Sequence, residues 1–123
     1  MNLSSRFNNL NYSYDCEVDV LYCKIRLPYI YDYTIPVTPI FNIDISEKTK
    51  RVVAFELLDA SKILKLEPDE LKETPNVKFT VQITSDIIKV ICNIRTVNGG
   101  MAGFSVKALN ENNAKPGLYY YYT

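Results

Sequence analysis

Three acidic side chains, Asp15, Glu17 and Asp19, occupy alternate positions near the start of the 123-residue chain. On a strand this spacing places three carboxylates on one face, where their oxygens could hold Ca²⁺ or Mg²⁺. The spacing is similar to the start of a calcium loop, but the following glycine and the distal glutamate are missing. A turn with solvated acidic side chains explains the same residues better, so metal binding is the weaker interpretation.

A second group of acidic residues, Glu56 and Asp59, lies at the end of the apolar run 51–58. A buried carboxylate could act as a general acid or base, but its most common partner, histidine, is absent from the chain. We therefore expect Glu56 to face outward or to pair with a lysine or arginine, and Asp59 to cap a helix. Ser61 and the cysteines lack a neighbouring base, and residues 98–103 lack the lysine of a phosphate loop. The sequence predicts no enzymatic activity and no cofactor.

Tyrosine is in excess, with ten copies and no tryptophan. It is enriched at protein interfaces because it combines a large apolar ring with a polar tip. Prolines around the first tyrosine group, and the chain end beside the second, favour sheet edges, which can pair with another chain. The alternative is that the rings cover the protein's own sheet. The predicted protein interface comprises Tyr29, Tyr31, Tyr33, Tyr119, Tyr120, Tyr121 and Tyr122.

Charge and cysteine content restrict the possible partners. Fourteen basic and fourteen acidic residues cancel, so no net field attracts nucleic acid or an anionic membrane, and nucleic acid is not an expected partner. The chain shows no apolar run of membrane-spanning length and no signal-peptide pattern. Three cysteines, Cys16, Cys23 and Cys92, cannot all pair with one another, and their spacing excludes C-x-x-C sites. Reduced thiols in a cytoplasmic protein are expected, with Cys23 and Cys92 buried in strands.

Alternation of apolar and polar residues indicates the elements that position these side chains. Residues 1–11 are polar and predict a loose lead-in. One or two short helices are expected in mid-chain, over residues 60–66 and 68–72. The pattern predicts one α+β domain over residues 1–123, with a mainly antiparallel sheet of about seven short strands. These strands fall within residues 18–27, 29–35, 41–46, 51–58, 77–83, 88–95 and 104–109.

Two stretches are more specific than strand patterns. Residues 14–22 read YDCEVDVLY and residues 53–61 read VAFELLDAS. Together they resemble a small prokaryotic family of domains of unknown function, whose pattern is YD-x-E-x-D-x-LY followed by G-x-E-x-LDAS. The resemblance covers about residues 12–66, with Ala54 in place of the usual glycine.

The resemblance implies a compact unit of antiparallel strands followed by a short helix, without an established enzyme activity. Family members are often encoded beside small toxin-like proteins, which suggests an antitoxin-like role by analogy. Residues 29–39 and 75–123 have no counterpart in the pattern. We expect residues 75–123 to add a β-hairpin module and a tyrosine-rich tail that complete the sheet or supply a binding surface.

These observations predict a non-catalytic protein that binds a protein partner, or itself as a homodimer, through exposed β edges and tyrosine-rich surfaces. One alternative is an inhibitor of another protein, either an antitoxin-like partner of a small toxin or a phage or mobile-element blocker of a host defence enzyme. Another alternative is a small-ligand or divalent-metal binding protein built around Asp15, Glu17, Asp19 and Glu56. No membrane association is expected.

Overall fold

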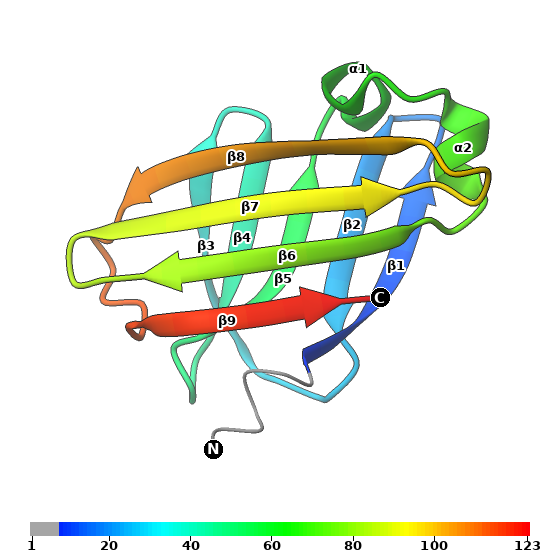
Figure 1. The fold of residues 1–123 in the computed structure, drawn as a ribbon. Coiled ribbons are helices and arrows are strands. Elements are labelled where there is room, and N and C mark those ends of the chain that lie inside the picture. Colours follow the sequence, from blue (N-terminus) through cyan, green and yellow to red (C-terminus); the bar gives the residue numbers. More distant parts are fainter. Residues whose placement is uncertain (1–7) are drawn as a thin grey trace.

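The computed structural model describes the backbone of residues 8–123 and the side chains from Asn9 onward. Within these residues the chain forms nine strands and two short helices (Figure 1). The predicted α+β class with a mainly antiparallel sheet is confirmed, but the number of strands is nine rather than seven. In chain order the elements are β1 (Asn8–Asp15), β2 (Val20–Ile25), β3 (Tyr31–Thr38), β4 (Phe41–Ser46), β5 (Val52–Leu57), α1 (Ala60–Leu64), α2 (Pro68–Lys72), β6 (Asn76–Ile83), β7 (Ile87–Arg95), β8 (Met101–Leu109) and β9 (Gly117–Tyr122).

All nine strands belong to one sheet in the order β3-β4-β5-β2-β1-β9-β6-β7-β8. The sheet curls over so that β6–β9 lie in front of β1–β5 and cross them steeply, giving a nearly closed barrel (Figure 1). Neighbouring strands are antiparallel except at the seam, where β1 and β9 run parallel. The seam is short, because only Asn8 and Asn9 of β1 pair with β9.

The two strands that the sequence pattern missed are the two that form this seam. Part of β1 falls within the predicted lead-in, because only Leu10, Tyr12 and Tyr14 supply its inward face among asparagines and serines. Four consecutive tyrosines hide the alternation of β9, since the same residue type occupies both faces. Residues 1–7 of the predicted lead-in lie outside the described residues.

The core between the two layers is built around phenylalanine rings. Phe55 of β5 and Phe79 of β6 stack with ring centroids 3.9 Å apart, which joins the back layer to the front layer. Tyr121 meets Phe55 edge-on, and its hydroxyl donates a hydrogen bond to the Val52 carbonyl at 2.6 Å. Full burial of each such side chain stabilises the fold by roughly 1.5–3 kcal/mol. The packing of β5 against β6 and β9 therefore holds the barrel closed.

The buried cysteines follow the sequence-based expectations, and two short helices lie in the expected part of the chain, although α1 ends at Leu64 rather than at residue 66. Cys23 and Cys92 are buried, while Cys16 is exposed. Burial raises the pKa of the Cys23 thiol to about 12, which keeps it protonated and unreactive. Helix α2 begins with proline in its first turn, and the Glu67 N–H donates to Glu70 Oε1 at 3.1 Å in a capping box. Neither helix in the described part of the chain has the length and apolarity required to cross a membrane.

The two edges of the sheet are unequal. Strand β3 contains Pro36 and shifts register at two places, which matches the edge strand predicted from its prolines. Strand β8 at the other edge has nine residues and no proline. Proline and bulges protect an edge from pairing with another chain, so β8 is the less protected edge.

Candidate functional site

The two motif stretches meet at Asp19, in the turn between β1 and β2. Asp19 Oδ1 accepts hydrogen bonds from the Tyr14 hydroxyl at 2.6 Å and from the Ser61 N–H at 3.0 Å. Asp19 Oδ2 accepts from Ser61 Oγ at 2.7 Å, and the Asp19 carbonyl accepts from the Ala60 N–H at 3.0 Å. Residues 42 positions apart thus form one contact that fixes the start of α1 on the β1–β2 turn.

Asp59 occupies the predicted N-cap position of α1, but the prediction that its side chain caps the helix is wrong. Its backbone is left-handed, with a φ of 52°, and its side chain makes no capping hydrogen bond. A capping residue normally has an extended backbone, from which its side chain reaches the amides of the first turn. Asp19 satisfies the Ser61 amide instead, so the helix is capped from a distant part of the chain.

The three candidate metal ligands do not converge. Asp15 Oδ1 accepts the Glu17 N–H within the turn, and both carboxylate oxygens of Asp19 accept the hydrogen bonds described above. Residues 8–123 contain no group of three or more His, Cys, Asp or Glu side chains placed to hold a metal ion. Burial raises the pKa of Asp19, but the hydrogen bonds from Tyr14 and Ser61 outweigh it, so the net pKa is lowered. Asp19 is therefore an ionised structural residue.

Glu56 lies on the outer surface of the back layer, between the buried side chains of Phe55 and Leu57. Its outward position is one of the two expected alternatives, and its Oε1 accepts a hydrogen bond from Asn42 Nδ2 at 3.0 Å, so its partner is an amide and not a lysine or arginine. This contact joins neighbouring strands β4 and β5, in which Asn42 and Glu56 are direct cross-strand partners. The arrangement assigns Glu56 to sheet pairing.

The first tyrosine group does not form one stripe. The register of β3 shifts between Tyr31 and Tyr33, which interrupts the shared face that alternate spacing would produce. Tyr31 is 56% exposed, whereas Tyr33 packs partly against the core and donates its hydroxyl to the Asn112 carbonyl at 2.7 Å. Tyr29 precedes β3 and is half-buried. Of the three, Tyr31 is the one that presents most of its ring to solvent.

The second tyrosine group divides between the two sides of β9. Tyr119 and Tyr121 are 3% and 2% exposed, which corrects their prediction as interface residues. They are buried because β9 lies inside the sheet between β1 and β6, so that alternate side chains enter the core. Tyr120 is 43% exposed and Tyr122 is half-buried, and both lie on the outer surface.

The outer surface of β6–β9 gathers positive charge. Strands β6 to β9 contain four charged residues, all cations, and no aspartate or glutamate. Each cation alternates with buried neighbours or, in β8, with half-buried ones, and therefore points outward. We call this surface the cationic face and define it by the side chains Lys78, Lys89, Arg95, Lys107, Tyr120 and Tyr122.

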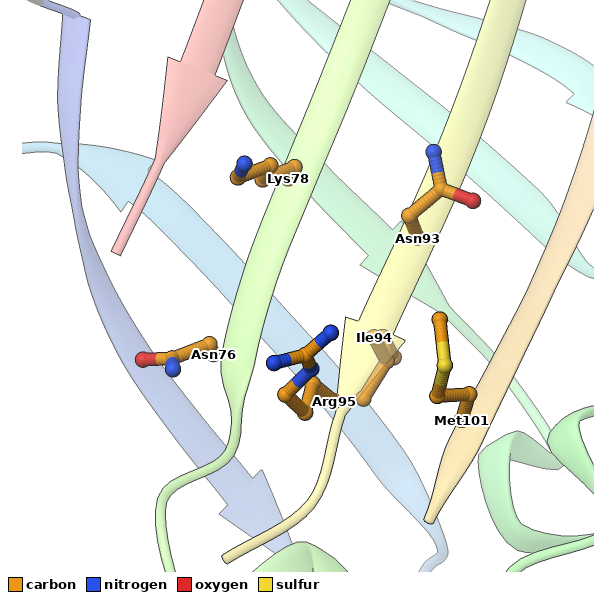
Figure 2. Close-up of a pocket in the computed structure, with 6 residues that line it drawn as sticks. All are labelled: Asn76, Lys78, Asn93, Ile94, Arg95 and Met101. Atoms are coloured by element: carbon orange, nitrogen blue, oxygen red, sulfur yellow. The ribbon is translucent and has the colours of Figure 1, made fainter. Parts of the chain in front are cut away.

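A shallow hollow of about 280 Å³ lies at one end of the cationic face (Figure 2). The strand register aligns Asn76 of β6, Arg95 of β7 and Met101 of β8 in one row, and Lys78 and Asn93 in the next. Figure 2 shows Arg95 between Asn76 and Met101, beside the end of β7. Two cations and two amides thus surround an open depression with an exposed thioether, a chemistry suited to binding an anion with hydrogen-bonding groups. The lining residues are Asn76, Lys78, Asn93, Ile94, Arg95 and Met101.

The opposite end of the cationic face holds two like charges side by side. Lys89 of β7 and Lys107 of β8 are direct cross-strand partners. Like charges in this position destabilise a sheet. The ion pairs Lys50–Asp32 and Lys72–Asp69 do not involve the cationic face. A bound anion would relieve this repulsion, whereas the chain itself does not.

Sequence reasoning missed the four cations because it considered the total charge. The position of the charged residues in the sequence indicates the positive surface. Every charged residue at an outward position of the alternating runs 77–83 and 88–95 is basic. Combined with Lys107 in the next strand, this pattern predicts a local positive surface on a chain with zero net charge.

Comparisons of the chain with protein-family models, with curated proteins and with solved structures found no match. The resemblance of residues 12–66 to a domain family stays a prediction.

Proposed function

We propose that this chain is a non-catalytic binding protein that holds an anionic macromolecule on its cationic face. The observation that carries the proposal is the sorting of charge, with four cations and no carboxylate in the strands of one sheet layer. Because the total charge is zero, this surface is positive through its placement alone. Clustered charge of one sign raises the local concentration and association rate of an oppositely charged partner.

The side chains around the cations support a binding role. Tyr120 and Tyr122 add aromatic area to the same surface, so part of the tyrosine interface expected from the sequence is retained on it. The amides of Asn76 and Asn93 offer both donors and acceptors beside Lys78 at the hollow. The hollow is lined by groups that bind and orient a ligand, without a carboxylate or thiol beside them to serve as a base or nucleophile.

Retention on heparin, used as a generic polyanion, tests the proposal. The unmodified protein should be retained and released by added salt, because salt screens exposed charges. Lys78→Glu/Arg95→Glu should elute without added salt. The matched control, Lys24→Glu/Lys48→Glu, makes the same change of charge on a strand of the back layer and on a turn, and should elute like the unmodified protein. Equal elution of the two double variants would contradict the proposal.

A second candidate function is self-association across β8. The strand is the less protected of the two sheet edges, and its terminal side chains Met101 and Leu109 are 73% and 64% exposed. Pairing of two β8 edges would produce the homodimer expected from the sequence. Light scattering behind size exclusion should then show a dimer that Leu109→Glu converts to a monomer. Val18→Glu, at a turn residue with 63% exposure, is the control, and a monomeric unmodified protein would exclude this candidate.

A further inference from the structure

We infer that the anionic partner is single-stranded nucleic acid, with its phosphates at the four cations and its bases stacked on Tyr120 and Tyr122. This inference rests on the proposed function, which requires only that the cationic face bind a polyanion. Proteins that bind single strands combine a positive surface along the backbone of the ligand with aromatic rings for its bases. The register of the front layer supplies both features on one surface.

The rings and the cations are direct neighbours in the sheet. Tyr122 of β9 pairs with Lys78 of β6, and Tyr120 pairs with Thr80 one row further along. Side chains opposite each other on one face have Cβ atoms roughly 5 Å apart, so a phosphate at Lys78 places the adjoining base within reach of Tyr122. Four-stranded sheets that read single-stranded RNA use outward aromatic rings in the same way.

The spacing of the cations favours an elongated ligand over a compact anion. Arg95 and Lys89 lie six residues apart in the outward row of β7. At about 3.3 Å per residue this separation is about 20 Å, longer than a single phosphate group can bridge. The row next to Arg95 holds Lys78 and Asn93, and the row after it is uncharged, with Thr80 on β6 and Ser105 on β8 both aligned with Ile91. A flexible polyanion can reach both ends across this neutral strip.

Three other partners fit less well. An acidic protein segment would neutralise the cations. Its carboxylates have no flat bases to stack on the tyrosine rings, and they leave the donor and acceptor pairs of the Asn76 and Asn93 amides only partly used. A second copy of this chain offers four carboxylates in β1–β5, but Asp15, Asp32, Asp44 and Glu56 each already accept a hydrogen bond within their own chain. Double-stranded nucleic acid keeps its base faces stacked inside, out of reach of the rings. The single strand uses every feature of the cationic face.

Fluorescence anisotropy with a labelled oligothymidylate of about 12 nucleotides tests the inference, since single small β domains occupy roughly 4–16 nucleotides. Poly-L-glutamate of equal charge and unlabelled heparin serve as competitors. We expect the oligonucleotide to be displaced by poly-L-glutamate only at about tenfold or greater excess. The logarithm of the association constant should fall with the logarithm of salt concentration with a slope of about −3, as expected for four phosphate contacts on a single strand.

Paired substitutions separate stacking from charge. Tyr122→Leu keeps apolar volume but removes the ring, and it should weaken oligothymidylate binding on the order of tenfold while heparin binding is unchanged. Tyr122→Phe keeps the ring and should bind like the unmodified protein. Lys89→Glu/Lys107→Glu should weaken the binding of both oligothymidylate and heparin. Unchanged thermal melting of each variant shows that the barrel is intact, and the Phe variant provides the comparison if the Leu variant melts early.

The outcomes distinguish the two proposals. If heparin and poly-L-glutamate bind as tightly as the oligonucleotide and Tyr122→Leu has no effect, the partner is an acidic protein or another polyanion, which overturns the inference and keeps the proposed function. If no polyanion binds, both are overturned. Binding of the oligonucleotide that depends on the ring at position 122 supports both.

Discussion

The outer surfaces of the two sheet layers use charge in opposite ways. Strands β1–β5 carry four carboxylates and one lysine, whereas β6–β9 carry four cations and no carboxylate. On the back layer, Asp44 accepts from Thr34 Oγ1 at 2.7 Å, and Glu56 accepts from Asn42. On the front layer none of the four cations makes a hydrogen bond or ion pair within residues 8–123. The carboxylates of the first surface are hydrogen-bonded within the chain, whereas the cations of the second surface face solvent.

The carboxylates of β1–β5 and the cations of β6–β9 should contribute differently to the stability of the fold. A carboxylate that accepts hydrogen bonds from its own chain stabilises the fold, and removing it leaves those donors without a partner. An exposed cation without such a contact contributes little to stability, so replacing it affects mainly binding. Substitutions on the two layers should therefore have different effects on unfolding.

The largest expected effect on stability is at Asp19, which joins the β1–β2 turn to α1. Asp19→Ala removes three side-chain hydrogen bonds and leaves the amide and hydroxyl of Ser61 without their acceptor. We expect the free energy of unfolding to fall by about 2–3 kcal/mol, as for loss of a helix cap together with a charged hydrogen-bond acceptor. Urea denaturation measures it. Asp15→Ala is the control and should lower the free energy of unfolding much less, because Asp15 accepts the Glu17 N–H within its own turn. Equal decreases for the two variants would show that the hydrogen bonds of Asp19 do not stabilise the fold more than that of Asp15.

A smaller loss is expected at Asp44 on the outer surface of the back layer. Its carboxylate joins β4 to β3 through Thr34 and approaches the Tyr22 hydroxyl of β2 at 3.5 Å. Asp44→Ala should lower the free energy of unfolding by about 1 kcal/mol, the net value of one hydrogen bond. Lys78→Ala, its counterpart on the cationic face, should leave the denaturation midpoint almost unchanged. A comparable loss from Lys78→Ala would remove the distinction between the two layers.

Lys107→Glu should produce a small gain. The substitution converts the like-charge pair with Lys89 into an opposite-charge cross-strand pair. We expect about 0.5 kcal/mol of added stability in urea denaturation at low salt, with a smaller gain at high salt because the pair is screened. The same variant should bind heparin more weakly than the unmodified protein. A variant that is less stable, or that binds equally well, would show that the Lys89–Lys107 pair is not held in place for an anion.

The smallest effect concerns pH. The pKa of Asp19 in the folded protein lies below its ordinary value of 3.8, because hydrogen bonds from Tyr14 and Ser61 favour the ionised form more than burial disfavours it. The contribution of Asp19 is therefore complete above the unfolded value and is lost as the pH falls through the lower, folded value. Urea midpoints between neutral pH and pH about 3 should fall less steeply in Asp19→Asn than in the unmodified protein. Parallel curves for the two proteins would contradict this assignment.

The regular alternation of apolar and polar residues by itself determined much of the fold. The β6–β7 hairpin follows from two clean apolar and polar alternations, because burial of one sheet face requires a period of two residues. The prolines predicted that β3 lies at a sheet edge and that α2 begins at a proline. Proline lacks the N–H that a central strand or a later helical turn requires. Apolar surroundings likewise predicted the burial of Cys23 and Cys92. Each of these outcomes depends on residues close together in the chain.

Tertiary structure alone decided the seam and the cap of α1, and the sheet register brought the cations together on one face. The β1–β9 pairing joins the two ends of the described chain, and four tyrosines in a row show no period from which to infer it. The partner of the Ser61 amide is Asp19, 42 residues away, rather than the neighbouring Asp59. Composition sums charge over the whole chain, whereas the sheet turns Lys78, Lys89, Arg95 and Lys107 to one side. The local field of a surface depends on where its charges lie rather than on their sum, and the register of β6, β7 and β8 sets those positions here.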